Sequence, residues 1–162
     1  MSNLARDERL SLEDGTSHPK SFLGEDTVRY MCIGYNDEKK WDSMSEAQRN
    51  SFLDACFAYD DVLRAGGHFV AGEALHGAKS ATSVRYQNGK ASVTDGPFVE
   101  TKEQMGGVLI LEAKDLDEAI ELISKHPGIS NAGFEIRPIA DLGAMVRESE
   151  KRRGVKASTA PR

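Results

Sequence analysis

The order of apolar and polar positions along the chain predicts a strand followed by a long helix. Residues 28–35 are almost all apolar and rich in aromatic and β-branched side chains, which predicts a strand buried on both faces. Ser43 and Glu46 have the spacing of a capping box, so a helix should begin there, and Gly66 should end it. An apolar stripe recurs at helical spacing: Phe52, Cys56, Tyr59 and Leu63, supported by Ala55 and Val62. The charged positions fall mostly elsewhere on this helix: Asp54, Asp60, Asp61 and Arg64.

The remaining pattern predicts a hairpin, a second helix and three further strands. Residues 68–75 form the second strand, and alternation over residues 82–93 around Asn88-Gly89 predicts a tight β-hairpin. Residues 106–113 are another buried strand. Asp115 and Glu118 cap a helix that ends before residues 126–128, and residues 134–139 form the last strand.

This order of elements predicts an α+β fold. It is the ferredoxin-like βαββαβ pattern with an inserted β-hairpin, in which two helices cover one face of an antiparallel sheet. The opposite sheet face is partly apolar and needs a cover that this chain does not obviously supply. We therefore expect a homodimer in which two sheets pack face to face.

The composition of the two ends differs from that of the middle. Residues 1–27 lack apolar periodicity and are interpreted as a flexible N-terminal extension. Residues 28–142 form one domain, and residues 143–162 form a basic C-terminal tail. A basic tail is compatible with RNA or a membrane surface, although a solvated terminus is the commoner meaning of such a pattern.

Length, charge and cysteine usage narrow the function classes. A chain of 162 residues favours one compact unit, and a net charge of −5 opposes binding to a phosphate backbone, so nucleic acid is an unfavoured partner. The longest apolar run, residues 106–111, is far below the roughly 20 residues that cross a bilayer. Cys32 and Cys56 lack the spacing of a metal or redox pair, which together with the absence of a signal-like start predicts a cytoplasmic protein.

One segment resembles a known family. Residues 95–103 read DGPFVETKE, followed by Gly106-Gly107 and by DLDEAI at residues 115–120. With residues 70–75 and 135–139, these motifs resemble the YCII-related domain family, specifically its DGPF (DGPFAETKE) branch, over about 115 residues. The resemblance implies a dimeric α+β barrel with a cleft between the subunits, in a superfamily that includes dehydrochlorinases and monooxygenases alongside members of unknown function.

The resemblance also implies a His–Asp pair with its histidine on the first helix, and the first predicted helix here contains no histidine. That pair therefore cannot be transferred. The DGPF branch frequently neighbours genes for extracytoplasmic-function sigma factors, which implies a regulatory alternative.

Three residues are candidate catalytic groups. Asp95, in the DGPF turn, is either a general base or the carboxylate of an Asx-type turn. Glu73, in a mostly apolar strand, would have a raised pKa if it faced the dimer cleft, and otherwise points to solvent. His126 ends the second helix, where the macrodipole favours its protonated form, so capping is its alternative role.

A second group of residues is expected to bind the substrate. Lys102 could hold an anion or pair with Asp95, and Glu100 would share its polar rim, unless this loop is simply solvated. Tyr35, Tyr59 and Phe98 could line an apolar pocket, although Tyr59 on the helical stripe also suits the core.

No metal-binding, nucleophile-elbow or phosphate-loop motif occurs, so no cofactor and no metal is predicted. The sequence thus favours a small-molecule enzyme or ligand-binding protein with acid–base chemistry of the lyase or isomerase kind. The alternative is a non-catalytic dimeric regulatory module associated with a sigma factor.

Overall fold

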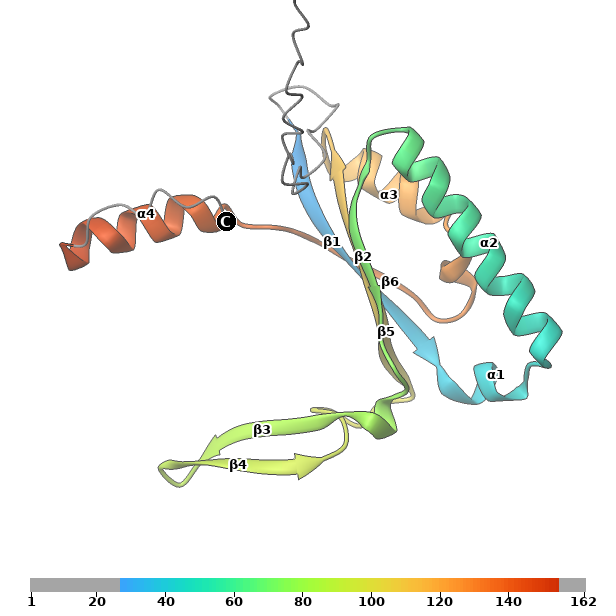
Figure 1. The fold of residues 1–162 in the computed structure, drawn as a ribbon, viewed down its shortest axis with the longest axis horizontal. Coiled ribbons are helices and arrows are strands. Elements are labelled where there is room, and N and C mark those ends of the chain that lie inside the picture. The colour runs from blue at the N-terminus through green and yellow to red at the C-terminus, as the bar shows by residue number, and fades with distance from the viewer. Residues whose placement is uncertain (1–26, 155–162) are drawn as a thin grey trace, which may run out of the picture.

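The computed structural model describes residues 27–154, which form a four-stranded antiparallel sheet with two helices packed on one face, and a hairpin arm and a further helix projecting on the other side (Figure 1). The sheet has the order β2-β5-β1-β6. Its strands are β1 (Val28–Asp37), β2 (Phe69–Ala74), β5 (Glu103–Ala113) and β6 (Gly133–Pro138). The helices are α1 (Glu38–Ser43), α2 (Glu46–Ala65), α3 (Leu116–Ser124) and α4 (Leu142–Arg153), with short 3₁₀ turns η1 (Ala78–Ser80) and η2 (Pro127–Ser130). This topology confirms the ferredoxin-like α+β prediction.

The core lies between the sheet and the two helices α2 and α3. Alternate residues of β1 and β5 point toward these helices, which is why Cys32 and Leu111 are fully buried. From the helices, Leu63 of α2 and Ile123 of α3 complete the cluster. Leu63 belongs to the apolar stripe predicted for the first helix, so that stripe faces the covered side of the sheet.

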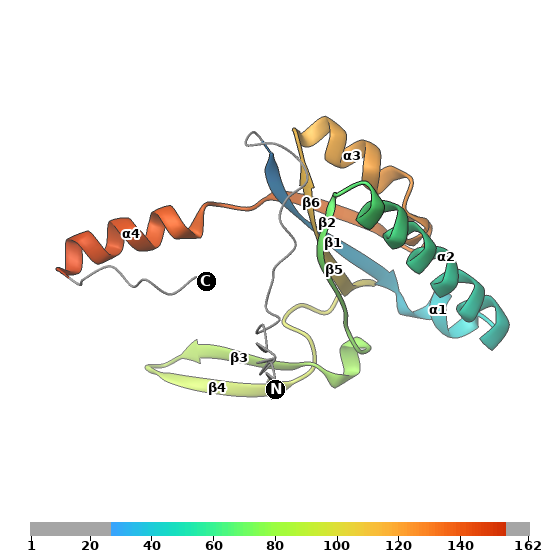
Figure 2. The ribbon, with the colours of Figure 1, turned by 45° about the horizontal axis from the view of Figure 1, so that its top comes forward.

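The predicted hairpin forms an arm between β2 and β5. Its strands, β3 (Thr82–Gln87) and β4 (Lys90–Asp95), form a separate two-stranded sheet. Asn88 and Gly89 both have positive φ, as the two-residue turn predicted from this dipeptide requires. The arm extends on the side of the sheet opposite to α2 and α3, and so does α4 (Figure 2).

The start of the long helix corrects one prediction. Ser43 ends α1, with its hydroxyl donating to the Lys40 carbonyl, and the N-cap of α2 is Ser45. Ser45 and Gln48 form the reciprocal capping box, because Gln48 stands three residues after the cap and Glu46 only one. The predicted box from Ser43 to Glu46 is therefore wrong.

The chain ends differ in how far they are described. Of the predicted extension, residues 1–26 lie outside the described residues, as do residues 155–162 of the tail. The first part of the tail is the helix α4, which Asp141 caps at its start and Gly154, with φ of 65°, ends. The sequence does not predict this helix, because the segment lacks an apolar stripe. The two caps are its local sequence signals. No helix within residues 27–154 combines the length and apolar character needed to cross a bilayer.

Candidate functional site

A cavity of about 670 Å³ lies between α2 and the sheet, on the helix-covered side. Its sheet wall includes Gly34, Gly72 and Gly107, whose lack of side chains leaves space below the helix. A Cβ at Gly72 would come within 2.8 Å of Leu109, and a Cβ at Gly107 within 2.7 Å of the Glu73 carbonyl. The three glycines therefore leave this part of the sheet surface without side chains. All residues that line the cavity belong to one chain. The cleft expected between two sheets is a separate place, and it stays a prediction.

Asp60 and His126 form a buried pair at the cavity wall. Asp60 is on α2 and is 9% exposed, while His126 stands just before η2 and is 6% exposed. The two side chains meet with His126 Nε2 at 3.4 Å from Asp60 Oδ1. His126 Nδ1 accepts a hydrogen bond of 2.9 Å from the Gly128 N–H, so in the neutral ring the proton is on Nε2, facing Asp60.

Burial lowers the pKa of His126, because desolvation of the charged ring outweighs the attraction and hydrogen bonding of Asp60. The ring is also packed edge-on against Tyr59 and Phe134, at centroid distances of 5.7 and 5.2 Å. The expectation that the macrodipole of the preceding helix would favour the protonated form is therefore wrong. The loss of hydration among apolar groups destabilises the imidazolium more than the dipole of the helix end stabilises it.

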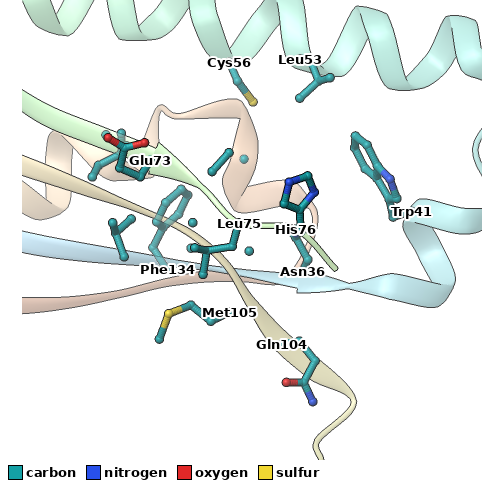
Figure 3. A pocket seen from close by; sticks show the side chains of 18 of the residues that line it. Asn36, Trp41, Leu53, Cys56, Glu73, Leu75, His76, Gln104, Met105 and Phe134 are labelled. Carbon is teal, nitrogen blue, oxygen red and sulfur yellow. The ribbon is translucent and has the colours of Figure 1, made fainter. Parts of the chain in front are cut away.

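The rest of the cavity wall mixes apolar and acidic groups. Trp41 lies at one end of the view in Figure 3 and Glu73 at the other, with Cys56 and His76 between them. Burial raises the pKa of the Cys56 thiol, with a smaller contribution from the charge of Asp60. The acidic lining residues are Glu38, Asp42, Asp60 and Glu73, and the basic ones are Arg64 and Lys79. Carboxylates therefore outnumber cations around this space. No three His, Cys, Asp or Glu side chains gather as metal ligands within residues 27–154.

Asp95 and Phe98 lie outside this cavity, on the arm and just beyond it. Asp95 is exposed at the end of β4, and its carboxylate forms no ion pair or hydrogen bond with any described residue. Phe98 is 62% exposed and stacks under the guanidinium of Arg85 at 3.9 Å. The DGPF segment thus shapes the base of the arm.

Glu100 and Lys102 border a second, shallower hollow of about 520 Å³ between the base of the arm and α1. Lys102 Nζ lies 3.3 Å from a carboxylate oxygen of Asp37, the residue that caps α1. This contact contributes to holding the pKa of Asp37 below its usual range, after the larger effect of the Lys40 backbone N–H. The two hollows share Glu38, Ala78, Lys79 and Gln104, so the second one lies at the mouth of the main cavity.

Neither predicted tyrosine lines the cavity. Tyr35 donates a hydrogen bond of 3.0 Å to Glu135 on the adjacent strand β6, and this bond is the main reason that the pKa of Tyr35 is raised. Tyr59 donates a bond of 2.8 Å to the Leu122 carbonyl of α3 and packs against the core. Of the two alternatives for Tyr59, pocket lining and core packing, the geometry supports core packing.

Of the eight predicted site residues, Glu73 and His126 border the main cavity, and Glu100 and Lys102 border the second hollow. The side chain of Glu73 on β2 is exposed. Sequence reasoning missed Asp60, which it placed on the polar side of the helix. Helical geometry offered a signal, since Asp60 follows Cys56 by four residues and precedes Leu63 by three, and both belong to the apolar stripe. The carboxylate therefore falls on the inner face, where His126 meets it.

Comparison with known proteins identifies relatives of this chain. A model of the YCII-related domain family matches residues 28–143. An uncharacterised protein of Rhizobium meliloti (strain 1021) is 30% identical over 115 residues, which cover 68% of this chain and 91% of that protein. The solved 5-chloro-2-hydroxyhydroquinone dehydrochlorinase from Burkholderia phenoliruptrix AC1100, in complex with 2,5-dihydroxybenzoquinone, is 17% identical. It aligns with a TM-score of 0.44, covering 70% of this chain and 94% of that chain.

Proposed function

We propose that this chain, which belongs to the YCII-related domain family, is a small-molecule enzyme that moves a proton in the cavity under α2. The ligand is a small, uncharged and mostly apolar molecule. Asp60 is the general base or acid, and His126 is the residue that positions it.

The single observation that carries this proposal is the buried Asp60–His126 pair at the cavity wall. A carboxylate that is nine-tenths buried is costly unless it is stabilised, and within residues 27–154 Asp60 Oδ1 meets the His126 ring at 3.4 Å without a formed hydrogen bond. His126 Nδ1 accepts from the Gly128 N–H and Nε2 faces Asp60 Oδ1 at 3.4 Å, so both ring nitrogens face protein groups. Asp60 lines the cavity, and its Oδ2 atom is not among the fully buried unpaired oxygens. The reacting proton is therefore assigned to Asp60.

The charge of the lining supports an uncharged ligand. Four carboxylates border the cavity, and of its two cations Arg64 is paired with Asp61 at 2.8 Å and stacked on Phe69. An anion would meet net repulsion in this partly enclosed space. Lys102, the residue expected to hold an anionic substrate, belongs to the mouth and is paired with Asp37.

A homodimer is the second part of the proposal. The arm carries Val84, Tyr86 and Val93 on one face, each more than 60% exposed, although an isolated two-stranded hairpin is only marginally stable in water. A second copy of this chain, packed on the sheet face opposite to α2 and α3, would cover this apolar face. Each cavity stays within one chain in such an assembly.

The test begins with ligands that the protein selects itself. The purified protein is incubated with a small-molecule extract of its source cells, and retained compounds are identified by native mass spectrometry. Wild-type protein is expected to convert at least one retained compound, whereas Asp60→Asn should bind it without conversion. Asp54→Asn is the matched control, because Asp54 is an exposed carboxylate on the same helix that does not line the cavity.

Two outcomes would overturn the proposal. Equal conversion by wild type and by Asp60→Asn would remove Asp60 from the chemistry. Retention of a compound that wild type never changes would instead favour the non-catalytic regulatory module. His126→Gln provides a second variant, since its amide can accept from Gly128 and donate to Asp60. It should retain much of the conversion if His126 only positions the carboxylate.

A further inference from the structure

Asn36 presents an amide to the cavity, and the oxygen of that amide accepts a hydrogen bond from a second, buried amide. Asn36 is near the end of β1, lines the cavity and stands close to His76 in Figure 3. Asn131, which follows η2 and is 7% exposed, donates from Nδ2 to Asn36 Oδ1 at 2.9 Å. The carbonyl end of the Asn36 amide is thereby occupied.

The other end of the Asn36 amide is free to bind a ligand. Within residues 27–154, Asn36 Nδ2 donates to no protein acceptor, and it is not among the fully buried unpaired atoms. Gly106 makes room for it, since a Cβ at this position would overlap the Nδ2 atom. Position 106 thus has no side chain that would displace the Asn36 amide, and the buried Asn131 contacts the oxygen end of that amide.

We infer that Asn36 selects ligands that carry an uncharged oxygen acceptor, such as a ketone, aldehyde or amide carbonyl, and that Asn131 is the residue that positions it. This inference rests on the proposed function and defines the substrate class of the same cavity. Asp60 and Glu73 supply acceptors, whereas the Asn36 amide supplies a neutral donor. Another lining amide, that of Gln104, is turned away to the carbonyls of Val99 and Thr101.

The experiment compares two small neutral aromatic probes of similar size. Acetophenone offers a carbonyl acceptor, and aniline, which is uncharged at neutral pH, offers N–H donors. Trp41 is the chain's single tryptophan and lines the cavity, so its one indole N–H resonance reports binding of either probe in an NMR titration. Wild-type protein should bind acetophenone about 3- to 10-fold more tightly than aniline, as one net hydrogen bond allows.

Two substitutions should reverse this preference by different routes. Asn36→Asp still accepts from Asn131 but turns its free end from donor to acceptor. Asn131→Asp removes the donor that orients Asn36, so the Asn36 amide should turn to donate to the new carboxylate and leave its Oδ1 toward the cavity. Asn50→Asp, at an exposed position of α2 outside the cavity, controls for the added charge and should keep the wild-type ratio.

The outcomes separate the inference from the proposal on which it rests. If both probes bind and Asn36→Asp keeps the wild-type ratio, the inference is wrong while the cavity remains a ligand site. If neither probe shifts the indole resonance in a saturable way, the proposed function and the inference both fail. Should Asn131→Asp lower the melting temperature without changing the ratio, Asn131 is only a structural residue, and the positioning role is overturned.

Discussion

The buried ring of His126 should make the stability of the protein fall as the pH drops below neutrality. Its pKa is lowered in the folded state by burial, whereas in the unfolded chain it returns to about 6.5. Between these two values the unfolded chain binds more protons than the folded one, so acid favours unfolding. The stabilising contribution is therefore complete above about pH 6.5 and is lost as the pH falls toward the folded-state pKa.

The magnitude follows from linkage for a single proton. The slope for one proton cannot exceed about 1.4 kcal/mol per pH unit, and it applies only between the folded-state pKa of His126 and its unfolded value of about 6.5. Urea unfolding at a series of pH values measures it. His126→Gln is the reference, because its amide can accept from Gly128 and face Asp60 without titrating, and its stability should decline less over the same interval.

The exposed carboxylates do not obscure this interval. Ion pairs and hydrogen bonds lower the pKa values of Asp37, Glu121 and Glu135, so their stabilising contributions are lost only in more acidic solution. Parallel pH profiles for wild type and His126→Gln would refute the reasoning. Such a result would mean that the pair keeps its proton count unchanged on unfolding.

Three further predictions concern the fold. Leu63→Ala, at a side chain that is 1% exposed, should cost about 2–5 kcal/mol in urea unfolding, and a loss below 1 kcal/mol would contradict the packing between α2 and the sheet. Ser45→Ala should cost about 1 kcal/mol, and Ser43→Ala clearly less; the reverse order would restore the earlier capping box. Light scattering should give the mass of a dimer, and Tyr86→Lys should weaken the association of the two chains. A monomer mass at every concentration would refute the homodimer.

The sheet could be predicted from the sequence because its signals are local. The apolar runs of β1 and β5 predict central strands, and Asn88-Gly89 predicts the hairpin independently of the rest of the chain. Asp115 and Glu118 cap α3 as their spacing indicates, with Asp115 accepting from the Glu118 N–H. Each of these features depends on residues that are at most a few positions apart.

The site could not be predicted in the same way, because its contacts join distant segments. Helical spacing places Asp60 on the inner face of α2, but its partner His126 comes from beyond α3 and cannot be paired with it from the sequence. Asp95 and Lys102 are close in sequence and both lie near the base of the arm, yet Asp95 stays exposed at the end of β4 while Lys102 pairs with Asp37. Likewise, nothing near Asn36 in the sequence announces Asn131, 95 residues later.

The way in which the arm joins the sheet separates two parts of the molecule that can change independently. Ala74 pairs with Gly107, and Leu75 N–H donates to the Gly106 carbonyl at 2.9 Å, so the inserted segment leaves and re-enters the sheet at neighbouring points. Lengthening, shortening or replacing the arm therefore carries little topological cost. Such changes reshape the entrance, where residues 75–79 and 104–105 lie, and leave Asp60 and His126 in place. A lineage could thus exchange the molecules that the cavity admits while retaining the Asp60–His126 pair at its wall.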